Sequence, residues 1–232
     1  MKHHPEFSWL EQYAAATLPL PVALCVSTHL SFCGECRRQL DLLQNLGGLL
    51  FAQLEPMPVA DELLQRILGR IDEPRDEIAE VVKEPMVVAP MSSVAPEQGS
   101  AIENNVDHIP QPLCKLIGAE YRNVKWSRML PSLHAANLSV GDQDYSVALH
   151  RVKPGGKIPR HDHRGQEFTV VLRGSFSDEY GIYSDGDFIL REPGDEHLPL
   201  AARYEECICL TVQQAPVRFT GLFWRCLNPL LR

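Results

Sequence analysis

Three candidate metal ligands stand within eight residues near the start of the chain, in the order His29-x3-Cys33-x2-Cys36. If this segment is helical, positions i, i+4 and i+7 share one face of the helix. One imidazole and two thiols on one face, with a fourth ligand from elsewhere, suit a tetrahedral zinc ion. Before His29, the candidates for that fourth ligand are His3 and His4.

The sequence around this cluster predicts short helices. Apolar residues recur at helical spacing in 6–17, 35–54 and 60–71, and a helix carrying His29 is expected to begin near Val22. About 70 residues in three or four short helices build only a thin core, which a bound metal would help to hold together. Residues 1–72 are therefore predicted to form a small helical bundle with a structural zinc ion.

Residues 73–107 differ in composition from both sides of the chain. They contain four prolines and no sustained periodicity, and their 2 basic and 8 acidic side chains give a net charge of −6. This composition is typical of a tether between domains. Residues 1–72 carry a net charge of −3 and residues 108–232 a net charge of +1. No region is basic enough for direct binding of nucleic acid, so a partner with a basic surface is expected.

The cysteines and the hydropathy indicate the compartment. The seven cysteines form an odd number, include a Cys-x2-Cys pair and follow no secretory leader, which is typical of a reducing compartment. No apolar run reaches the roughly 20 residues needed to span a bilayer. We expect a cytoplasmic protein without a membrane segment, in which Cys25, Cys114 and Cys226 are core or interface residues.

From about Pro112 onward the pattern predicts β-structure. Short runs rich in Val, Ile, Tyr and Phe alternate with glycine-containing turns, which is typical of a β-sandwich or barrel. The predicted strands are 144–152, 167–173, 176–183, 187–191 and 206–213.

A second ligand cluster lies within this region, in the pattern Gly155-x5-His161-x-His163-x3-Glu167-x6-Gly174. His161 and His163 are two residues apart on an expected strand, so both should point to the same face. Glu167 has the same parity across a short turn, and His197 is placed to arrive from a neighbouring strand. Three imidazoles and a carboxylate suit Zn, Mn, Fe, Ni or Co.

Other histidines and cysteines of this region carry weaker signals. His134 and His150 match neither cluster and are expected on the surface or in the core. Cys207 and Cys209 share one face of an expected strand, where they either line the cavity near the metal or simply pack. A redox role for this pair would require thiolate character and access.

The second cluster resembles the two sequence motifs of a cupin. The first motif matches at every fixed position. The second departs from the usual pattern by one extra residue between Gly186 and Pro193, and by Ala201 where asparagine is common, but it keeps His197. The resemblance implies a double-stranded β-helix, that is, a cupin β-barrel, that holds Zn²⁺ or another divalent transition metal through His161, His163, Glu167 and His197.

The N-terminal cluster resembles the zinc-binding domain of bacterial anti-sigma factors, with His4 as the implied fourth ligand. A domain of this kind followed by a cupin is similar to the ChrR family of anti-sigma factors. The resemblance implies that residues 1–72 hold an extracytoplasmic-function-type sigma factor, one to one. It further implies that the cupin domain, residues 108–232, senses singlet oxygen or organic hydroperoxides and releases that partner.

The predicted fold class is therefore α+β multidomain, and the predicted function is regulatory rather than enzymatic. The alternative is a metal-dependent cupin enzyme, such as a small dioxygenase, whose helical region serves as an oligomerisation arm. A DNA-binding regulator is disfavoured because no basic recognition helix is visible in the sequence.

Overall fold

The computed structural model describes residues 1–58, 60–72, 109–118 and 120–220. The chain divides into two compact units: Met1–Gly48 together with Val106–Arg232, and Leu49–Asn105. The predicted tether, 73–107, and Cys226 lie outside the described residues. The predicted domain boundaries at residues 72 and 107 therefore remain a prediction.

Four helices follow one another in the N-terminal part of the chain, as the periodicity predicts. They are α1 (Phe7–Ala14), α2 (Leu20–Phe32), α3 (Gly34–Ala52) and α4 (Asp61–Asp72). Pro21 falls in the first turn of α2, where the missing N–H has no intrahelical acceptor to lose. None of the described helices combines the length and the apolar character that crossing a membrane requires.

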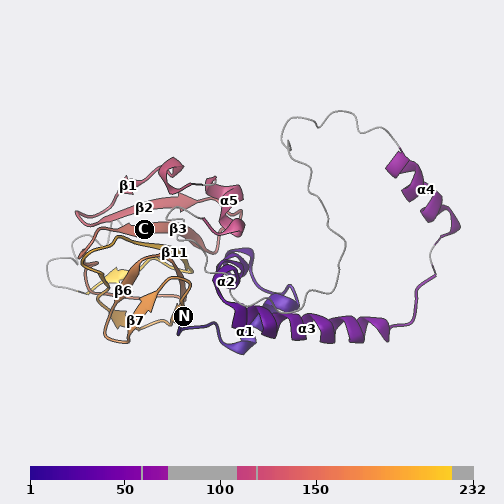
Figure 1. Ribbon diagram of the computed structural model, residues 1–232, viewed down its shortest axis with the longest axis horizontal. Helices are drawn as coiled ribbons and strands as arrows, with labels where there is room; N and C mark the ends of the chain where they lie inside the picture. The colour runs from indigo at the N-terminus through magenta and orange to yellow at the C-terminus, as the bar shows by residue number, and fades with distance from the viewer. Residues whose placement is uncertain (59, 73–108, 119, 221–232) are drawn as a thin grey trace, which may run out of the picture. The chain divides into compact units, whose positions relative to one another are not determined.

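One further helix and a single 3₁₀ turn precede the strands. Helix α5 spans Gln111–Ile117 and the turn η1 spans Tyr121–Asn123. The expectation of β-structure from Pro112 onward is therefore wrong at its start. Leu113 of α5 is fully buried, and α5 contacts α2 within the first unit (Figure 1).

The strands form three antiparallel sheets within the first unit. The largest sheet has the order β1-β2-β3-β11-β5-β8, and the two smaller sheets have the orders β10-β6-β7 and β12-β4-β9. The strands are β1 (Ser127–Arg128), β2 (Leu133–Leu138), β3 (Ser146–Val152), β4 (His161–Asp162), β5 (Glu167–Arg173), β6 (Ser175–Ser177), β7 (Ile182–Ser184), β8 (Phe188–Arg191), β9 (Glu196–His197), β10 (Leu200–Ala201), β11 (Cys207–Gln213) and β12 (Arg218–Phe219).

The predicted strand 176–183 is in fact a hairpin of two short strands, β6 and β7. Asp178 causes the break, because its Oδ1 accepts hydrogen bonds from the backbone N–H of Tyr180 (2.9 Å) and of Gly181 (3.1 Å). A carboxylate that binds the backbone in this way stabilises a turn rather than an extended strand. Strands β3, β5, β8 and β11 lie where the alternation predicts them, within one or two residues.

The helices share one core with the large sheet instead of enclosing a core of their own. Phe168 of β5 and Leu210 of β11 are fully buried in the same cluster as Leu10 of α1 and Val26 of α2. The ring of Trp9 packs edge-on against Phe168, with the centroids 5.0 Å apart. The expectation of a separate thin core within residues 1–72 is therefore wrong for α1 and α2, which lie against β5 and β11.

The other face of β5 and β11 faces away from these helices. Side chains alternate along a strand, so Glu167 and Thr169 of β5 share a face with Cys209 and Thr211 of β11. These residues line a cavity of about 420 Å³ in the first unit. Both strands are buried on both faces because helices cover one side and the cavity wall forms the other.

Two candidate metal centres

The first centre lies where α2 gives way to α3. Helix α2 ends at Phe32, Cys33 has extended backbone angles (φ −101°, ψ 103°), and α3 begins at Gly34. The three residues of the motif therefore do not share one face of a single helix. The turn at Cys33 nevertheless brings the ligand atoms of His29, Cys33 and Cys36 within 4.8 Å of one another and of an imidazole nitrogen of His4.

The distances within this cluster fit a tetrahedral ion. The His29 Nε2–Cys36 Sγ distance is 3.3 Å, and His4 Nδ1 lies 3.3 Å from Cys33 Sγ and 3.4 Å from Cys36 Sγ. Nitrogen and sulfur ligands at ordinary zinc distances are about 3.5 Å apart in a tetrahedron. His4 is the N-terminal histidine that joins the cluster, while the ring of His3 packs against Tyr183.

Burial shifts the pKa values of His29 and Cys36 in the first centre. Burial lowers the pKa of His29 to about 4, although the hydrogen bond to the Gly186 carbonyl opposes the shift. The neutral ring donates its Nδ1 proton to Gly186 O at 2.7 Å, which leaves Nε2 as a free lone pair. Burial and the neighbouring Cys33 thiol raise the pKa of Cys36 to about 12, so a cation is needed to hold it as a thiolate.

The second centre is formed by His161, His163 and His197, all buried, with ligand nitrogens within 4.8 Å of one another. His161 of β4 and His197 of β9 are directly opposite each other in an antiparallel pair, and their Nε2 atoms are 3.0 Å apart. Two ligands about 2.1 Å from a common ion and at right angles to each other have this separation. Strand β4 ends at Asp162, so His163 lies just beyond the strand that was expected to carry it.

Each imidazole of the second centre is oriented by an acceptor at Nδ1. The acceptors are Pro159 O for His161, Asp195 O for His163 and Asp178 Oδ2 for His197, each at 2.8 Å. This arrangement leaves every Nε2 facing the middle of the cluster, as in histidines that bind a metal. Among the described residues, the buried Nε2 of His163 has no hydrogen-bond partner, which is the position that a metal ion would satisfy.

Glu167 lies beside these histidines without joining the tightest group. Its Oε2 is 3.5 Å from His163 Nε2, and it accepts hydrogen bonds from Gln213 Nε2 and from Thr169 Oγ1. Burial works against ionisation, but His163, His161 and Gln213 together hold the pKa of Glu167 well below its usual range. Burial likewise opposes the proton on His163, whereas Glu167 outweighs burial and raises the pKa of that ring. A divalent cation would take the place of this proton.

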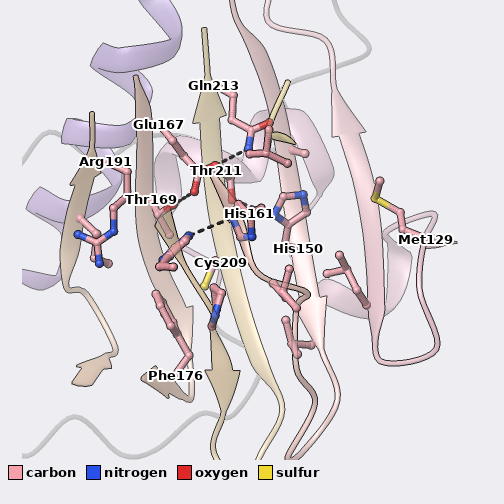
Figure 2. Close-up of a pocket in the computed structure, with 18 of the residues that line it drawn as sticks. Met129, His150, His161, Glu167, Thr169, Phe176, Arg191, Cys209, Thr211 and Gln213 are labelled. Atoms are coloured by element: carbon pink, nitrogen blue, oxygen red, sulfur yellow. Dashed lines mark hydrogen bonds between the residues drawn. The ribbon is translucent and has the colours of Figure 1, made fainter. Parts of the chain in front are cut away.

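The cavity extends from the second centre between the sheets. Figure 2 shows His161, Glu167, Thr169, Thr211 and Cys209 projecting into it from neighbouring strands. His150 also lines the cavity, with its Nδ1 3.1 Å from Thr211 Oγ1, and burial lowers its pKa. The expectation left open whether His150 was a surface or core residue. His150 alternates in β3 with the same parity as Ser146 and Ala148, and these two residues also line the cavity. This alternation is the signal that would have placed His150 on the cavity side of the strand.

Cys207 and Cys209 lie on the cavity wall, both buried, with their sulfur atoms 3.6 Å apart. The hydrogen bond with Cys207 and burial raise the pKa of Cys209 well above its ordinary value, so Cys209 is held as a thiol at neutral pH. Cys25 is a buried core residue whose thiol faces Phe168 O, and Cys114 is half-buried. Sequence reasoning missed Asp178, because nothing local links a turn residue to His197.

Comparison with known proteins places this chain in a family. Residues 115–217 match the family model described as ChrR Cupin-like domain. The curated protein "Anti-sigma-E factor ChrR" of Cereibacter sphaeroides is 31% identical over 100% of this chain and 99% of its own length. The chain belongs to the ChrR family of anti-sigma factors. The resemblance seen in the sequence is confirmed, and the family is one of regulators rather than enzymes.

A solved structure of the ChrR family has the same fold. In the crystal structure of Rhodobacter sphaeroides SigE in complex with the anti-sigma ChrR, the matching chain is 30% identical and has a TM-score of 0.71. The match covers 91% of this chain and 98% of that chain. An RmlC-like cupin protein from Ralstonia eutropha is 14% identical over 45% of this chain and 71% of its own, with a TM-score of 0.40. The match to the ChrR Cupin-like domain model and the likeness to the solved ChrR chain show that the fold is cupin-like, with β-sheets preceded by helices.

Proposed function

We propose that this chain is an anti-sigma factor that holds an extracytoplasmic-function-type sigma factor inactive in a one-to-one complex. Residues 1–72 bind the partner, residues 73–107 are the tether, and the cupin region, 108–232, releases the partner on oxidative stress. Membership of the ChrR family supports this proposal, as does the complex of a 30% identical relative with SigE. Sigma factors work with RNA polymerase, so the proposal places the protein in the cytoplasm.

The observation that carries the proposal is the exposure of large apolar side chains on α3 and on α4, taken within each unit. In the first unit, Leu42 and Leu46 of α3 are 71% and 53% exposed. Among the described residues of the second unit, the exposed large apolar side chains are those of Leu49, Leu50, Phe51, Leu54, Met57, Leu63, Leu64, Ile67 and Leu68. Burying one such side chain contributes about 1.5–3 kcal/mol, and extended apolar patches mark protein interaction sites. A sigma factor is the proposed partner that covers them.

The first centre supports this role as a structural zinc site. His4, His29, Cys33 and Cys36 would hold Zn²⁺, which is redox-inert and releases the thiol protons on binding. The ion would tie the N-terminus to the junction of α2 and α3. That junction fixes the start of α3, the helix that carries Leu42 and Leu46. The zinc ion is therefore proposed as a structural element of the partner-binding region.

The second centre is proposed to hold Zn²⁺ or another divalent transition metal through His161, His163, His197 and Glu167. Singlet oxygen attacks imidazoles, and three of them meet here beside an open cavity. A redox role is also proposed for Cys207 and Cys209. Oxidation of this thiol pair to a disulfide would pass two electrons and two protons to an organic hydroperoxide, which would leave as an alcohol and water.

Co-expression with a candidate sigma factor tests the binding step. The expected result is a stable one-to-one complex on gel filtration with light scattering. Leu50→Asp and Ile67→Asp should abolish the complex, and Cys36→Ser should do so through loss of the zinc site. Tyr204→Asp is the matched control, because Tyr204 is 96% exposed on the cupin region and should leave binding intact. A complex that survives both charged substitutions contradicts the proposed surface.

Exposure of the purified complex to singlet oxygen or an organic hydroperoxide tests the sensing step. Release of the sigma factor from the wild-type chain is expected, and loss of release in His197→Ala. Metal analysis of the complex should find zinc in the first centre. An unchanged response in His197→Ala contradicts the cupin region as the sensor. Catalytic turnover of an organic substrate by the cavity would favour the alternative of a cupin enzyme.

A further inference from the structure

His197 of the second centre is oriented by a buried carboxylate, that of Asp178. Asp178 Oδ2 is 2.8 Å from His197 Nδ1, and the Asp178 side chain is 0% exposed. The other oxygen of this carboxylate accepts two backbone N–H groups of the β6–β7 turn. A displacement of His197 would therefore act on a carboxylate that is itself hydrogen-bonded to the β6–β7 turn.

Arg191 links Asp178 to Tyr183. One guanidinium nitrogen of Arg191 donates to Asp178 Oδ2 and to the hydroxyl of Tyr183, both at 2.7 Å. Arg191 lies on β8 and lines the cavity (Figure 2), with a side chain that is only 10% exposed. Tyr183 lies on β7 and is 3% exposed, so both groups are held by packing as well as by hydrogen bonds.

Tyr183 meets the segment that carries a ligand of the first centre. Its ring packs on the ring of His3, with the centroids 4.7 Å apart. The carbonyl of His3 accepts the N–H of Phe188 at 3.0 Å, and Asp187 Oδ1 accepts the N–H groups of Lys2 and His3. The residue that precedes His4 thus contacts the β7–β8 segment, residues 182–191, at three points.

The same β7–β8 segment also accepts a hydrogen bond from His29, the other histidine of the first centre. Gly186, in the turn between β7 and β8, accepts the Nδ1 proton of His29 at 2.7 Å. An acceptor in this position orients a metal-binding imidazole and raises its basicity, and removing it typically lowers metal affinity about 10- to 100-fold. Both imidazoles of the N-terminal cluster therefore depend on the β7–β8 segment, whose last residue, Arg191, donates a hydrogen bond to Asp178, the partner of His197.

We propose that the β7–β8 segment couples the two centres through the contacts His197–Asp178–Arg191–Tyr183–His3, so that occupancy of the cupin centre strengthens metal binding by the N-terminal cluster. This inference rests on the proposed metal binding at both centres and gives the sensing step a route. The coupling is reciprocal, since a change in affinity at one site by the other must hold in both directions. Asp178, Arg191 and Tyr183 are positioning residues in this chain of contacts.

Cobalt titration of the full chain tests the coupling. Cobalt bound by Cys33 and Cys36 produces a thiolate charge-transfer band that should vanish in Cys36→Ser, so this band reports the first centre alone. His161→Ala disables the cupin centre. The expected result is that His161→Ala weakens cobalt binding at the first centre tenfold or more. In Tyr183→Phe, which keeps the ring packing but removes the hydroxyl, His161→Ala should change that affinity by less than twofold.

Tyr180→Phe is the matched control, because it removes only the hydroxyl, which donates to Glu196 O, and keeps the ring over the Arg191 guanidinium. The tenfold effect of His161→Ala should persist in this background, and thermal unfolding should show that both phenylalanine variants are folded. If the wild-type chain and His161→Ala bind cobalt at the first centre with the same affinity, the coupling is overturned while the proposed zinc site stands. Persistence of the effect in Tyr183→Phe would overturn the assigned route. Absence of any thiolate band would overturn the zinc site and the coupling together.

Discussion

Gly186→Ala probes how closely α2 packs against the turn of the β7–β8 segment. Gly186 has a positive φ of 83°, which L side chains rarely adopt. A Cβ at this position would lie 2.5 Å from Phe32 Cβ and 2.9 Å from Phe32 Cγ. Phe32 is the last residue of α2, three positions after His29, so relief of the clash must move the end of that helix.

The magnitude follows from two separate costs. A left-handed conformation costs a non-glycine residue about 1–2 kcal/mol. Overpacking a well-packed contact typically adds about 1–3 kcal/mol. Gly141→Ala is the matched control, because Gly141 has a similar φ of 79° but no atom within 4 Å of an added Cβ. The free energy of unfolding should therefore fall by about 1–3 kcal/mol more in Gly186→Ala than in Gly141→Ala.

Urea unfolding of the zinc-loaded full chain measures this difference, with the slope of the transition compared between variants to confirm that the same surface is exposed. A second measurement is zinc competition with a chromophoric chelator. Displacement of α2 removes the acceptor of His29, so zinc affinity should fall about tenfold or more in Gly186→Ala and stay unchanged in Gly141→Ala. If Gly186→Ala and Gly141→Ala lower the free energy of unfolding equally and bind zinc equally well, the tight contact between α2 and the turn at Gly186 is refuted.

Three further predictions follow from burial and charge. Phe168→Ala, in the core shared by helices and sheet, should lower the free energy of unfolding by about 3–5 kcal/mol in urea, and a loss below 1 kcal/mol would contradict the shared core. In the metal-free chain, the pKa values of His29 and His161 are lowered to about 4, mainly by burial, against about 6.5 in the unfolded chain. Between about pH 6.5 and 4 the unfolded chain then binds more protons at these two residues, so the melting temperature should fall as the pH is lowered through this range; a flat profile would argue against these shifts. Chelation of zinc should lower the melting temperature, with recovery on adding zinc but not magnesium, because thiolates favour the softer ion; recovery with magnesium would contradict a thiolate site.

The sequence alone was sufficient to predict which ligands meet when those ligands are close together in the chain. Cys33 and Cys36, or His161 and His163, are so near each other that few backbone conformations separate their side chains, and both pairs meet in the structure. Strands β3, β5 and β11 could be predicted because each is a short run rich in β-branched and aromatic residues, and glycine-containing turns separate these runs. The ChrR family resemblance rests on these local patterns.

Tertiary structure decided what depends on contacts between distant segments. No spacing rule connects residue 4 with residue 29, so only folding brings His4 to the cluster and places His3 on Tyr183. Asp178 reads as an ordinary turn residue until strand pairing puts it against His197. The helical periodicity of α1 and α2 likewise predicts a buried face but not the surface that buries it. That surface is β5 and β11, because the apolar face of a sheet and the apolar faces of these helices are each stable only when the other excludes water.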